Sequence, residues 1–328
     1  MESYLFPLDG SDELAKSILD ASNNWPVDLH TKFGSMQSQK FSDGELCPDF
    51  TESVRGKRIY ILSSANNSDK IINLELAIDA GRRAGAKEII PVLPYFPYAR
   101  QDKKDQSRGP IGAKVMARKL EMLGATTVIA FDLHADQIQG FFEIPVIHIE
   151  GKNVFDKYIA SIYTPDTILA GPDAGSGKRV KRMKAQLGKY HDINLNYIML
   201  DKTRTKANEV EEMVIIGDPN GKDVIILDDM ADTSGTLCKA AEVLMNAGAK
   251  SVRAVISHGV LSGKAYENIS RSKLTELIVS DSLSVKTFEC GPAFSKIKQI
   301  SVAKQIGFAM AALNNDMSFE ALRNTKNA

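Results

Sequence analysis

The feature that most constrains the fold is a regular alternation of short β-branched runs with amphipathic stretches. Six such runs recur along the 328 residues: RIYIL (58–62), KEIIPVL (87–93), TTVIAF (126–131), TILA (167–170), DVIIL (223–227) and SVRAVIS (251–257). Apolar strands separated by helical segments are typical of a mainly parallel sheet with helices on both faces. The chain is therefore predicted to be an α/β protein.

Three of the predicted helices lead into a strand through a glycine. RRAGAKEII, EMLGATTVI and MNAGAKSVR place Gly85, Gly124 and Gly248 directly after an apolar periodic segment. Because glycine reaches positive φ without steric cost, these positions are predicted to be left-handed helix caps.

The spacing of these elements suggests an internal repeat. The runs that end at Leu62 and Leu227 lie about half a chain apart, and so do the glycines Gly85 and Gly248. This spacing predicts either two copies of one α/β unit or two separate units of the same common type. Only the second run is followed by paired acids, in DDMADTSGT, whereas the first is followed by SSANNSDK. If the two units are copies, only the second has kept a phosphate site after this strand.

Composition excludes several classes of partner. Lys plus Arg and Asp plus Glu both number 41, so no global positive field exists to hold nucleic acid or an anionic membrane surface. The three cysteines are scattered and form no CxxC pair, which argues against a disulfide framework and a zinc site. No run approaches the ~20 apolar residues of a membrane span. A cytoplasmic protein is expected.

The segment VIILDDMADTSGT (224–236) carries a dense polar pattern behind a predicted strand. Asp228 and Asp229 are expected at the C-terminal edge of that strand, where open α/β sheets bind ligands and carboxylates can contact sugar hydroxyls or a cation. The turn that follows opens a helix and consists of Asp232, Thr233, Ser234, Gly235 and Thr236. Backbone N–H groups at a helix N-terminus, beside hydroxyls and a glycine, form an anion cradle that fits a monophosphate.

The alternative for this turn is an ordinary helix cap, with Thr233 or Ser234 as the N-cap residue. A cap accounts for one hydroxyl. It does not account for two acids at the strand edge followed by three hydroxyls and a glycine.

A second polar cluster follows the predicted strand at 87–93. The segment PYFPYARQDKKDQSR (94–108) contains Arg100, Gln101, Asp102, Lys103, Lys104, Asp105 and Arg108. In a chain without net charge this density indicates a polyphosphate or nucleotide site, because guanidinium groups match phosphate oxygens bidentately. A solvated charged loop is the alternative, although the aromatic lead-in would suit a nucleotide base.

Two further strand ends carry possible Mg²⁺ ligands. FDLHADQIQGFF (131–142) places Asp132 and His134 after a strand, and GPDAGSGKR (171–179) places Asp173 before a Gly-rich turn. Mg²⁺ bound with a triphosphate takes few protein ligands and keeps several waters, so a sparse set is compatible with it. A single histidine is, however, more often structural or merely exposed.

The segment LDKTRTKANEVE (200–211) places Lys202, Arg204 and Lys206 on alternate positions without an apolar face. Such cations usually belong to a solvated loop. In phosphoryl transfer a mobile basic loop would instead close over the site and stabilise the charge that develops.

Taken in order, six motifs resemble the ribose-phosphate diphosphokinase (phosphoribosyl pyrophosphate synthetase) family, nearly end to end. They are FSDGE (41–45), FPYARQDKKD (96–105), FDLHADQIQGFF, PDAG, K-T-R-x-K-A-N-E-V and DDMADTSGT. The resemblance implies two tandem type I phosphoribosyltransferase-like domains, each a mainly parallel sheet flanked by helices. The N-terminal domain (1–150) would carry a degenerate phosphate loop and ATP-site residues, and the C-terminal domain (151–328) the ribose-5-phosphate loop and a catalytic loop. A homo-oligomer, usually a hexamer built from dimers, is also implied.

The activity implied is the Mg²⁺-dependent synthesis of 5-phosphoribosyl 1-diphosphate from ATP and ribose 5-phosphate. The anomeric hydroxyl attacks the β-phosphorus and AMP leaves, so catalysis is mostly alignment and neutralisation of phosphate charge. The product would feed nucleotide biosynthesis.

The resemblance also implies roles for single residues. Lys202 and Arg204 would be the catalytic cations. The expected ATP-binding residues are Phe41, Asp43, Gly44, Glu45, Arg100, Gln101 and Asp105, and the segment that holds the first four would reach the neighbouring subunit's nucleotide. The expected ribose-5-phosphate-binding residues are Arg204, Asp228, Asp229, Asp232, Thr233, Ser234, Gly235 and Thr236. The expected Mg²⁺ ligands are His134, Asp173 and Asp132.

Two segments depart from the family pattern. SSANNSDKIINLEL (63–76) does not match the usual N-D-N-L-M-E-L and is shorter, and WPVDLHTKFGSMQSQKF (25–41) is longer. Both lie in regions that influence subunit contacts and regulation. Activation by inorganic phosphate and inhibition by ADP therefore do not follow from the resemblance, although Arg108 is compatible with them.

Two other functions share part of the pattern. A phosphoribosyltransferase would need DDMADTSGT but not a second nucleotide half. A non-catalytic regulatory relative should have a damaged catalytic loop or cradle, and both are intact in this sequence.

Overall fold

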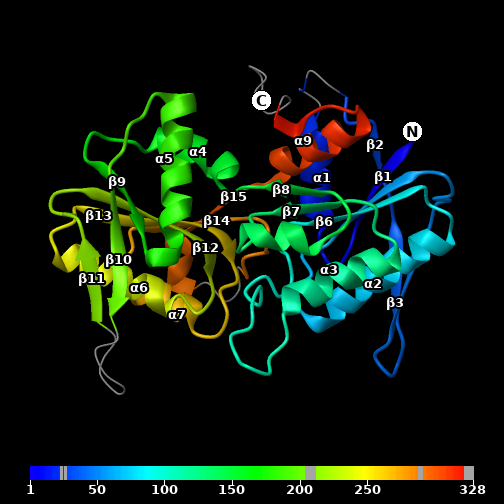
Figure 1. Cartoon of the computed structure of the whole chain (residues 1–328), viewed down its shortest axis with the longest axis horizontal. Coiled ribbons are helices and arrows are strands. Elements are labelled where there is room, and N and C mark those ends of the chain that lie inside the picture. Colours follow the sequence, from blue (N-terminus) through cyan, green and yellow to red (C-terminus); the bar gives the residue numbers. More distant parts are fainter. Residues whose placement is uncertain (23–24, 26–27, 204–211, 287–290, 321–328) are drawn as a thin grey trace. The chain divides into compact units, whose positions relative to one another are not determined.

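The computed structural model describes residues 1–22, 25, 28–203, 212–286 and 291–320, which form two compact units (Figure 1). The first unit comprises Met1–Glu150 together with the described chain from Ser301 onward, and the second comprises Gly151–Ile300. Each unit has its own sheet and its own apolar core. None of the described helices is long and apolar enough to cross a membrane.

The first unit is built on a six-stranded sheet in the order β2-β1-β5-β6-β7-β8, whose described pairings are all parallel. Its strands are β1 (Ser3–Pro7), β2 (Thr31–Phe33), β5 (Arg58–Leu62), β6 (Glu88–Leu93), β7 (Val128–Phe131) and β8 (Val146–Ile149). Its helices are α1 (Asp12–Ala21), α2 (Ser68–Arg83), α3 (Gly112–Leu123), η2 (Asp136–Phe141) and α9 (Ala303–Asn314). A separate antiparallel hairpin consists of β3 (Met36–Lys40) and β4 (Leu46–Phe50).

Side-chain alternation on β5 shows how this sheet is covered. Ile59 and Ile61 belong to the core cluster that includes α2 and α3, while Tyr60 between them reaches α9 on the opposite face. Figure 1 shows α1 and α9 on one side of the sheet and α2 and α3 on the other. The sheet is thus buried on both faces, as the unbroken apolar run RIYIL predicted.

The second unit has a seven-stranded sheet in the order β11-β10-β9-β12-β13-β14-β15. Its strands are β9 (Thr167–Gly171), β10 (Tyr197–Thr203), β11 (Glu212–Ile216), β12 (Asp223–Ala231), β13 (Ser251–Gly259), β14 (Glu276–Ser280) and β15 (Ile297–Ile300). Its helices are α4 (Lys152–Ser161), η3 (Ala174–Ser176), α5 (Gly177–His191), α6 (Gly235–Asn246), α7 (Ala265–Arg271) and η4 (Gly291–Lys296). The β10–β11 pair is antiparallel and the other described pairs are parallel.

The two sheets share one connectivity. The order β1-β5-β6-β7-β8 in the first unit matches β9-β12-β13-β14-β15 in the second, so β5 corresponds to β12. This is the correspondence that the spacing of Leu62 and Leu227 suggested. All six strands expected from the sequence are present, and Gly85, Gly124 and Gly248 have φ values of 80°, 118° and 91°, which confirms the predicted left-handed positions.

One strand boundary was wrong. β12 does not end at Leu227 but continues to Ala231, because β13 is equally long and keeps pairing with it through Asp228↔Ile256 and Ala231↔Gly259. Asp228 and Asp229 therefore lie inside the last part of the strand, not after it.

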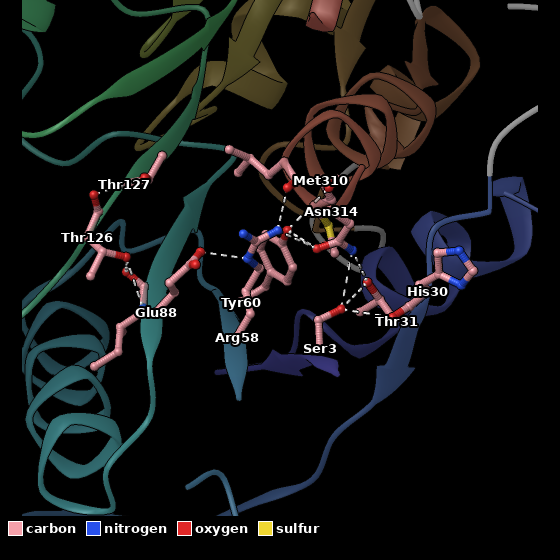
Figure 2. Close-up of polar contacts among 12 residues, drawn as sticks. Ser3, His30, Thr31, Arg58, Tyr60, Glu88, Thr126, Thr127, Met310 and Asn314 are labelled. Atoms are coloured by element: carbon pink, nitrogen blue, oxygen red, sulfur yellow. Dashed lines mark hydrogen bonds and ion pairs between the residues drawn. The ribbon is translucent and has the colours of Figure 1, made fainter. Parts of the chain in front are cut away.

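The C-terminal segment also differs from the expected division at 151–328, because the chain from Ser301 onward groups with the first unit. α9 packs beside α1, and Asn314 at its end is held by a polar network (Figure 2). Its Nδ2 donates to the carbonyl of Leu29 at 2.6 Å, and its Oδ1 accepts from Arg58 Nη1 at 2.9 Å and from the Tyr60 hydroxyl at 2.8 Å. Burial raises the pKa of Tyr60, so this phenol stays protonated and remains a donor.

Candidate active site

The turn between β12 and α6 forms the anion cradle, residues 232–236. Ser234 occupies the N-cap position of α6 with φ 60°, a left-handed conformation that is uncommon for a residue with a side chain. Its hydroxyl makes no capping bond and, although buried, has no hydrogen-bond partner among the described residues. Ordinary capping therefore does not explain this serine, and strained residues of this kind cluster at ligand sites.

Gly235 leaves open space beside that hydroxyl. A Cβ atom built on Gly235 would approach only Thr233 Oγ1, at 4.0 Å, among the described atoms. A side chain at Gly235 would partly fill the space beside the start of α6, where the first N–H groups of the helix have no partner within the helix. An anion suits such a position, since the helix dipole favours negative charge there.

The corresponding helix in the first unit has a different N-terminus. α2, which follows β5, has Asn67 at its N-cap, and the Asn67 side chain accepts a hydrogen bond from Lys70 N at 3.0 Å. One of the donors that a phosphate would need is therefore already satisfied within the chain. The two units thus differ at matching positions: a side chain caps α2, whereas the N-cap serine of α6 makes no such bond.

Two carboxylates of the second unit, Asp229 and Asp173, lie close enough to act on the charge of Asp228. Asp229 is buried and its N–H donates to Asp228 Oδ1 at 2.9 Å. Burial, together with the charges of Asp229 and Asp173, raises the pKa of Asp228 to about 8. Mutual repulsion of this kind is relieved by a bound cation or by hydroxyl donors, which are the ligands expected for this strand.

Asp173 is positioned by the turn after β9. Its Oδ1 accepts from Ser176 N at 2.9 Å, and its carbonyl accepts from Ser176 Oγ at 2.6 Å. Gly171 before it has no room for a side chain, because a Cβ would collide with Ser176 and Met199. The turn therefore fixes Asp173 near Asp228, and its carboxylate keeps a second oxygen for other ligands.

The expected nucleotide residues of the first unit lie on the loop between β6 and α3. Gln101 N donates to the Tyr98 carbonyl at 2.9 Å, and the Gln101 carbonyl accepts from Ala113 N at 3.2 Å, which folds this loop onto the start of α3. Asp102 accepts from Gln137 Nε2 at 2.6 Å. The contact of Asp102 joins the loop that carries Arg100, Gln101 and Asp105 to η2 within this unit.

Asp132 and His134 follow β7 as predicted. Asp132 is buried with φ 40°, and its N–H donates to Ile149 O at 2.7 Å, whereas His134 is exposed. His148 on β8 was not among the predicted site residues. Its Nε2 accepts from Leu133 N at 3.0 Å and so shapes this turn. The segment that contains it was not among the six predicted strands, so the sequence carried no signal for it.

Phe41, Asp43, Gly44 and Glu45 form the tip of the β3–β4 hairpin. Phe41 N donates to Glu45 O at 2.8 Å, Gly44 has φ 96°, and Glu45 N donates to Asp43 Oδ1 at 3.0 Å. The Phe41 ring is 45% exposed. A closed turn thus presents an aromatic ring to solvent.

The expected catalytic cations lie at the limit of the described chain. The backbone of Lys202 pairs with Met213 in the β10–β11 ladder. Arg204 lies outside the described residues, in the segment 204–211. No group of three or more His, Cys, Asp or Glu side chains that could hold a metal is assembled in the part of the chain that the structure describes. A site that shares Mg²⁺ with a triphosphate and water needs fewer protein ligands than such a group supplies.

Comparisons with known proteins agree with this arrangement. Residues 3–124 match the N-terminal domain of ribose phosphate pyrophosphokinase, and residues 175–323 match the phosphoribosyl synthetase-associated domain. The ribose-phosphate pyrophosphokinase of Wolinella succinogenes is 47% identical over 84% of this chain and 86% of its own length. That of Vibrio cholerae is 40% identical over 98% of each chain. The crystal structure of phosphoribosylpyrophosphate synthetase from Mycobacterium smegmatis matches with a TM-score of 0.86 and 31% identity, covering 96% of this chain and 100% of that one. The protein is therefore an enzyme of the ribose-phosphate pyrophosphokinase family.

Proposed function

We propose that the protein transfers the diphosphoryl group of ATP to the anomeric hydroxyl of ribose 5-phosphate, giving 5-phosphoribosyl 1-diphosphate and AMP. The observation that carries this proposal is the anion cradle, with a left-handed Ser234, a buried hydroxyl without a described partner, and open space at Gly235. A monophosphate would supply acceptors for that hydroxyl and for the N–H groups of α6. The product is a precursor for nucleotide biosynthesis, and the balanced charge and scattered cysteines remain the basis for proposing a cytoplasmic enzyme.

The sugar would lie against the end of β12. Asp228 and Asp229 would accept hydrogen bonds from the ribose hydroxyls, and Asp232, Thr233, Ser234, Gly235 and Thr236 would hold the phosphate. Arg204 would contribute a cation to the same substrate. Burial and the neighbouring carboxylates raise the pKa of Asp228, and hydroxyl donors at that carboxylate would compensate for both, which supports this assignment.

ATP would be bound by Arg100, Gln101 and Asp105, with Phe41, Asp43, Gly44 and Glu45 contributed by a neighbouring subunit. The exposure of Phe41 at the end of an ordered hairpin supports this role, because an apolar ring in solvent gains from packing against a base. A homo-oligomer follows from this arrangement, and we propose a hexamer built from dimers.

Mg²⁺ would be held by His134, Asp132 and Asp173, together with phosphate oxygens. When bound it neutralises phosphate charge and orients the triphosphate. The burial of Asp132 and the fixed turn of Asp173 support this set, because each residue directly follows a parallel strand.

Lys202 and Arg204 would stabilise the charge that develops during transfer. The anomeric oxygen bonds to the β-phosphorus while the bond to the oxygen of the α-phosphate breaks, so AMP leaves with that oxygen. The protein needs no covalent nucleophile for this step. Its contribution is the alignment of the two substrates and the neutralisation of charge.

The direct assay uses purified protein with ATP, Mg²⁺ and ribose 5-phosphate. The proposal predicts AMP and 5-phosphoribosyl 1-diphosphate in equal amounts, and no AMP when ribose 5-phosphate is omitted. Release of ADP, or no turnover at all, would contradict it. A phosphoribosyltransferase would instead consume 5-phosphoribosyl 1-diphosphate when a base is supplied.

A further inference from the structure

We infer that Ser262 and Asn268 are positioning residues that orient the backbone of the anion cradle and thereby set the affinity for ribose 5-phosphate. This inference rests on the proposed assignment of the cradle to the sugar phosphate. Ser262 lies in the loop after β13, and Asn268 lies on α7. Neither residue belongs to the six motifs from which the site was predicted.

Three consecutive carbonyls at the cradle accept hydrogen bonds from the loop after β13 and from α7. The carbonyl of Ala231 accepts from Leu261 N at 3.0 Å, and that of Asp232 accepts from Ser262 N at 3.2 Å. The carbonyl of Thr233 accepts from Asn268 Nδ2 at 2.8 Å. Every carbonyl from the end of β12 to the residue before Ser234 is therefore fixed by a donor from the same side.

Because the peptide bond is planar, the direction of each carbonyl also determines the direction of the next N–H group. In a trans peptide the C=O of one residue and the N–H of the next point in opposite directions, and the described chain contains no cis peptide bond. When the carbonyls of Ala231, Asp232 and Thr233 face Ser262 and Asn268, the following three N–H groups face the other way. Successive N–H groups that share one direction form an anion-binding concavity.

The side chain of Ser262 also contacts the cradle. Its hydroxyl hydrogen-bonds the Asp232 carboxylate, while its N–H bonds the carbonyl of the same residue. Both the backbone and the side chain of Asp232 are thus fixed by one residue. Precise placement of a ligand-binding group depends on supporting contacts of this kind.

The supporting loop is itself rigidly built. Leu261 is buried with φ 46°, and Ser262 O accepts from Ala265 N at 3.1 Å, which starts α7. At the end of β13, the buried His258 pairs through Nδ1 with Ser282 Oγ at 2.9 Å. Ser262 and Asn268 therefore extend from a fixed base, although Ser262 is exposed and Asn268 only half-buried.

The test measures ribose 5-phosphate binding by calorimetry and steady-state kinetics in Ser262→Ala and Asn268→Ala. We expect each variant to weaken ribose 5-phosphate binding and raise its KM about tenfold, with the KM for ATP within twofold and an unchanged thermal midpoint. Ser262→Thr keeps the hydroxyl and should recover affinity to within about threefold of the parent. Ser270→Ala is the matched control, since the Ser270 hydroxyl donates to Glu267 O at 2.8 Å on the same helix, and this variant should leave all constants unchanged.

The outcomes separate the inference from the proposed function. A parent enzyme that binds ribose 5-phosphate, with Ser262→Ala and Asn268→Ala binding equally well, would overturn the inference alone. Equal losses of affinity for ATP and ribose 5-phosphate, or a Ser262→Thr variant as weak as Ser262→Ala, would also overturn it. A parent protein that does not bind ribose 5-phosphate would remove the proposed function and this inference together.

Discussion

Asp228 lies beside Asp229 on β12, with Asp173 close enough to act on its charge. Burial and these two neighbours raise the pKa of Asp228 from 3.8 to about 8. The unfolded chain has neither the burial nor the neighbours, so the folded state holds this proton more tightly. The contribution of Asp228 to the free energy of unfolding is therefore greatest below pH 4. This contribution is lost as the pH rises toward 8.

Asp228→Asn removes this pH dependence. In EDTA, the stability advantage of the variant over the parent should be smaller at pH 5 than at pH 9, because the folded parent keeps Asp228 protonated at pH 5 and a protonated carboxyl resembles an amide. At pH 9 the variant should be the more stable by at least ~1.4 kcal/mol, the equivalent of one pKa unit. Urea denaturation at both pH values measures the difference. Asp192→Asn, at an exposed acid of the same unit, is the control, and a pH-independent difference for Asp228→Asn would contradict the account.

At the scale of elements, α9 depends on the last residue of its helix for its attachment to the first unit. Figure 2 shows the Asn314 amide between Arg58 and Tyr60 on one side and Ser3 and Thr31 on the other. The amide thus links the helix to three strands of one sheet: β1, β2 and β5.

Asn314→Ala should lower the free energy of unfolding by about 2–4 kcal/mol, because several polar groups lose their partner at once. Asn315→Ala should cost less than about 1 kcal/mol, since Asn315 makes its bond to Asp28 O in an exposed position. Chemical denaturation of both variants gives the comparison. Equal effects would show that the network in Figure 2 does not hold the helix.

Much of this architecture could be predicted from local patterns. β-branched runs located six of the strands, and glycines after apolar segments located three left-handed caps, because both signals depend on neighbouring residues only. The end of β12 could not be located in this way, since its length is set by pairing with β13. The apolar residues of α9 do not tell which of the two cores the helix covers, since its grouping with the first unit depends on tertiary contacts.

The candidate site could likewise be predicted from the sequence only in part. The hydroxyl-rich turn after β12 was visible as a motif, and the structure adds that Ser234 is left-handed and has a buried hydroxyl. The contacts that orient this turn come from Ser262 and Asn268, about thirty residues further along the chain. Such contacts depend on tertiary packing, and a single sequence carries no signal for them.

At the scale of the whole molecule, two similar units are proposed to bind different substrates, ATP in the first unit and ribose 5-phosphate in the second. The shared strand order makes them alike, and the contrast between the side-chain cap of α2 and the cradle of α6 makes them different. A chain with equal numbers of acids and bases has no net field to attract its substrates, so local groups must hold both. The cradle is the part of this scheme that the structure describes in most detail.

The most direct measurement is a crystal structure of the protein with ribose 5-phosphate, Mg²⁺ and a non-hydrolysable ATP analogue. The account predicts the sugar phosphate in the anion cradle, within hydrogen-bond distance of Ser234 Oγ and the N–H groups at the start of α6. It also predicts the anomeric hydroxyl facing the β-phosphorus of the nucleotide. An empty cradle in crystals that contain the sugar phosphate elsewhere would contradict the account.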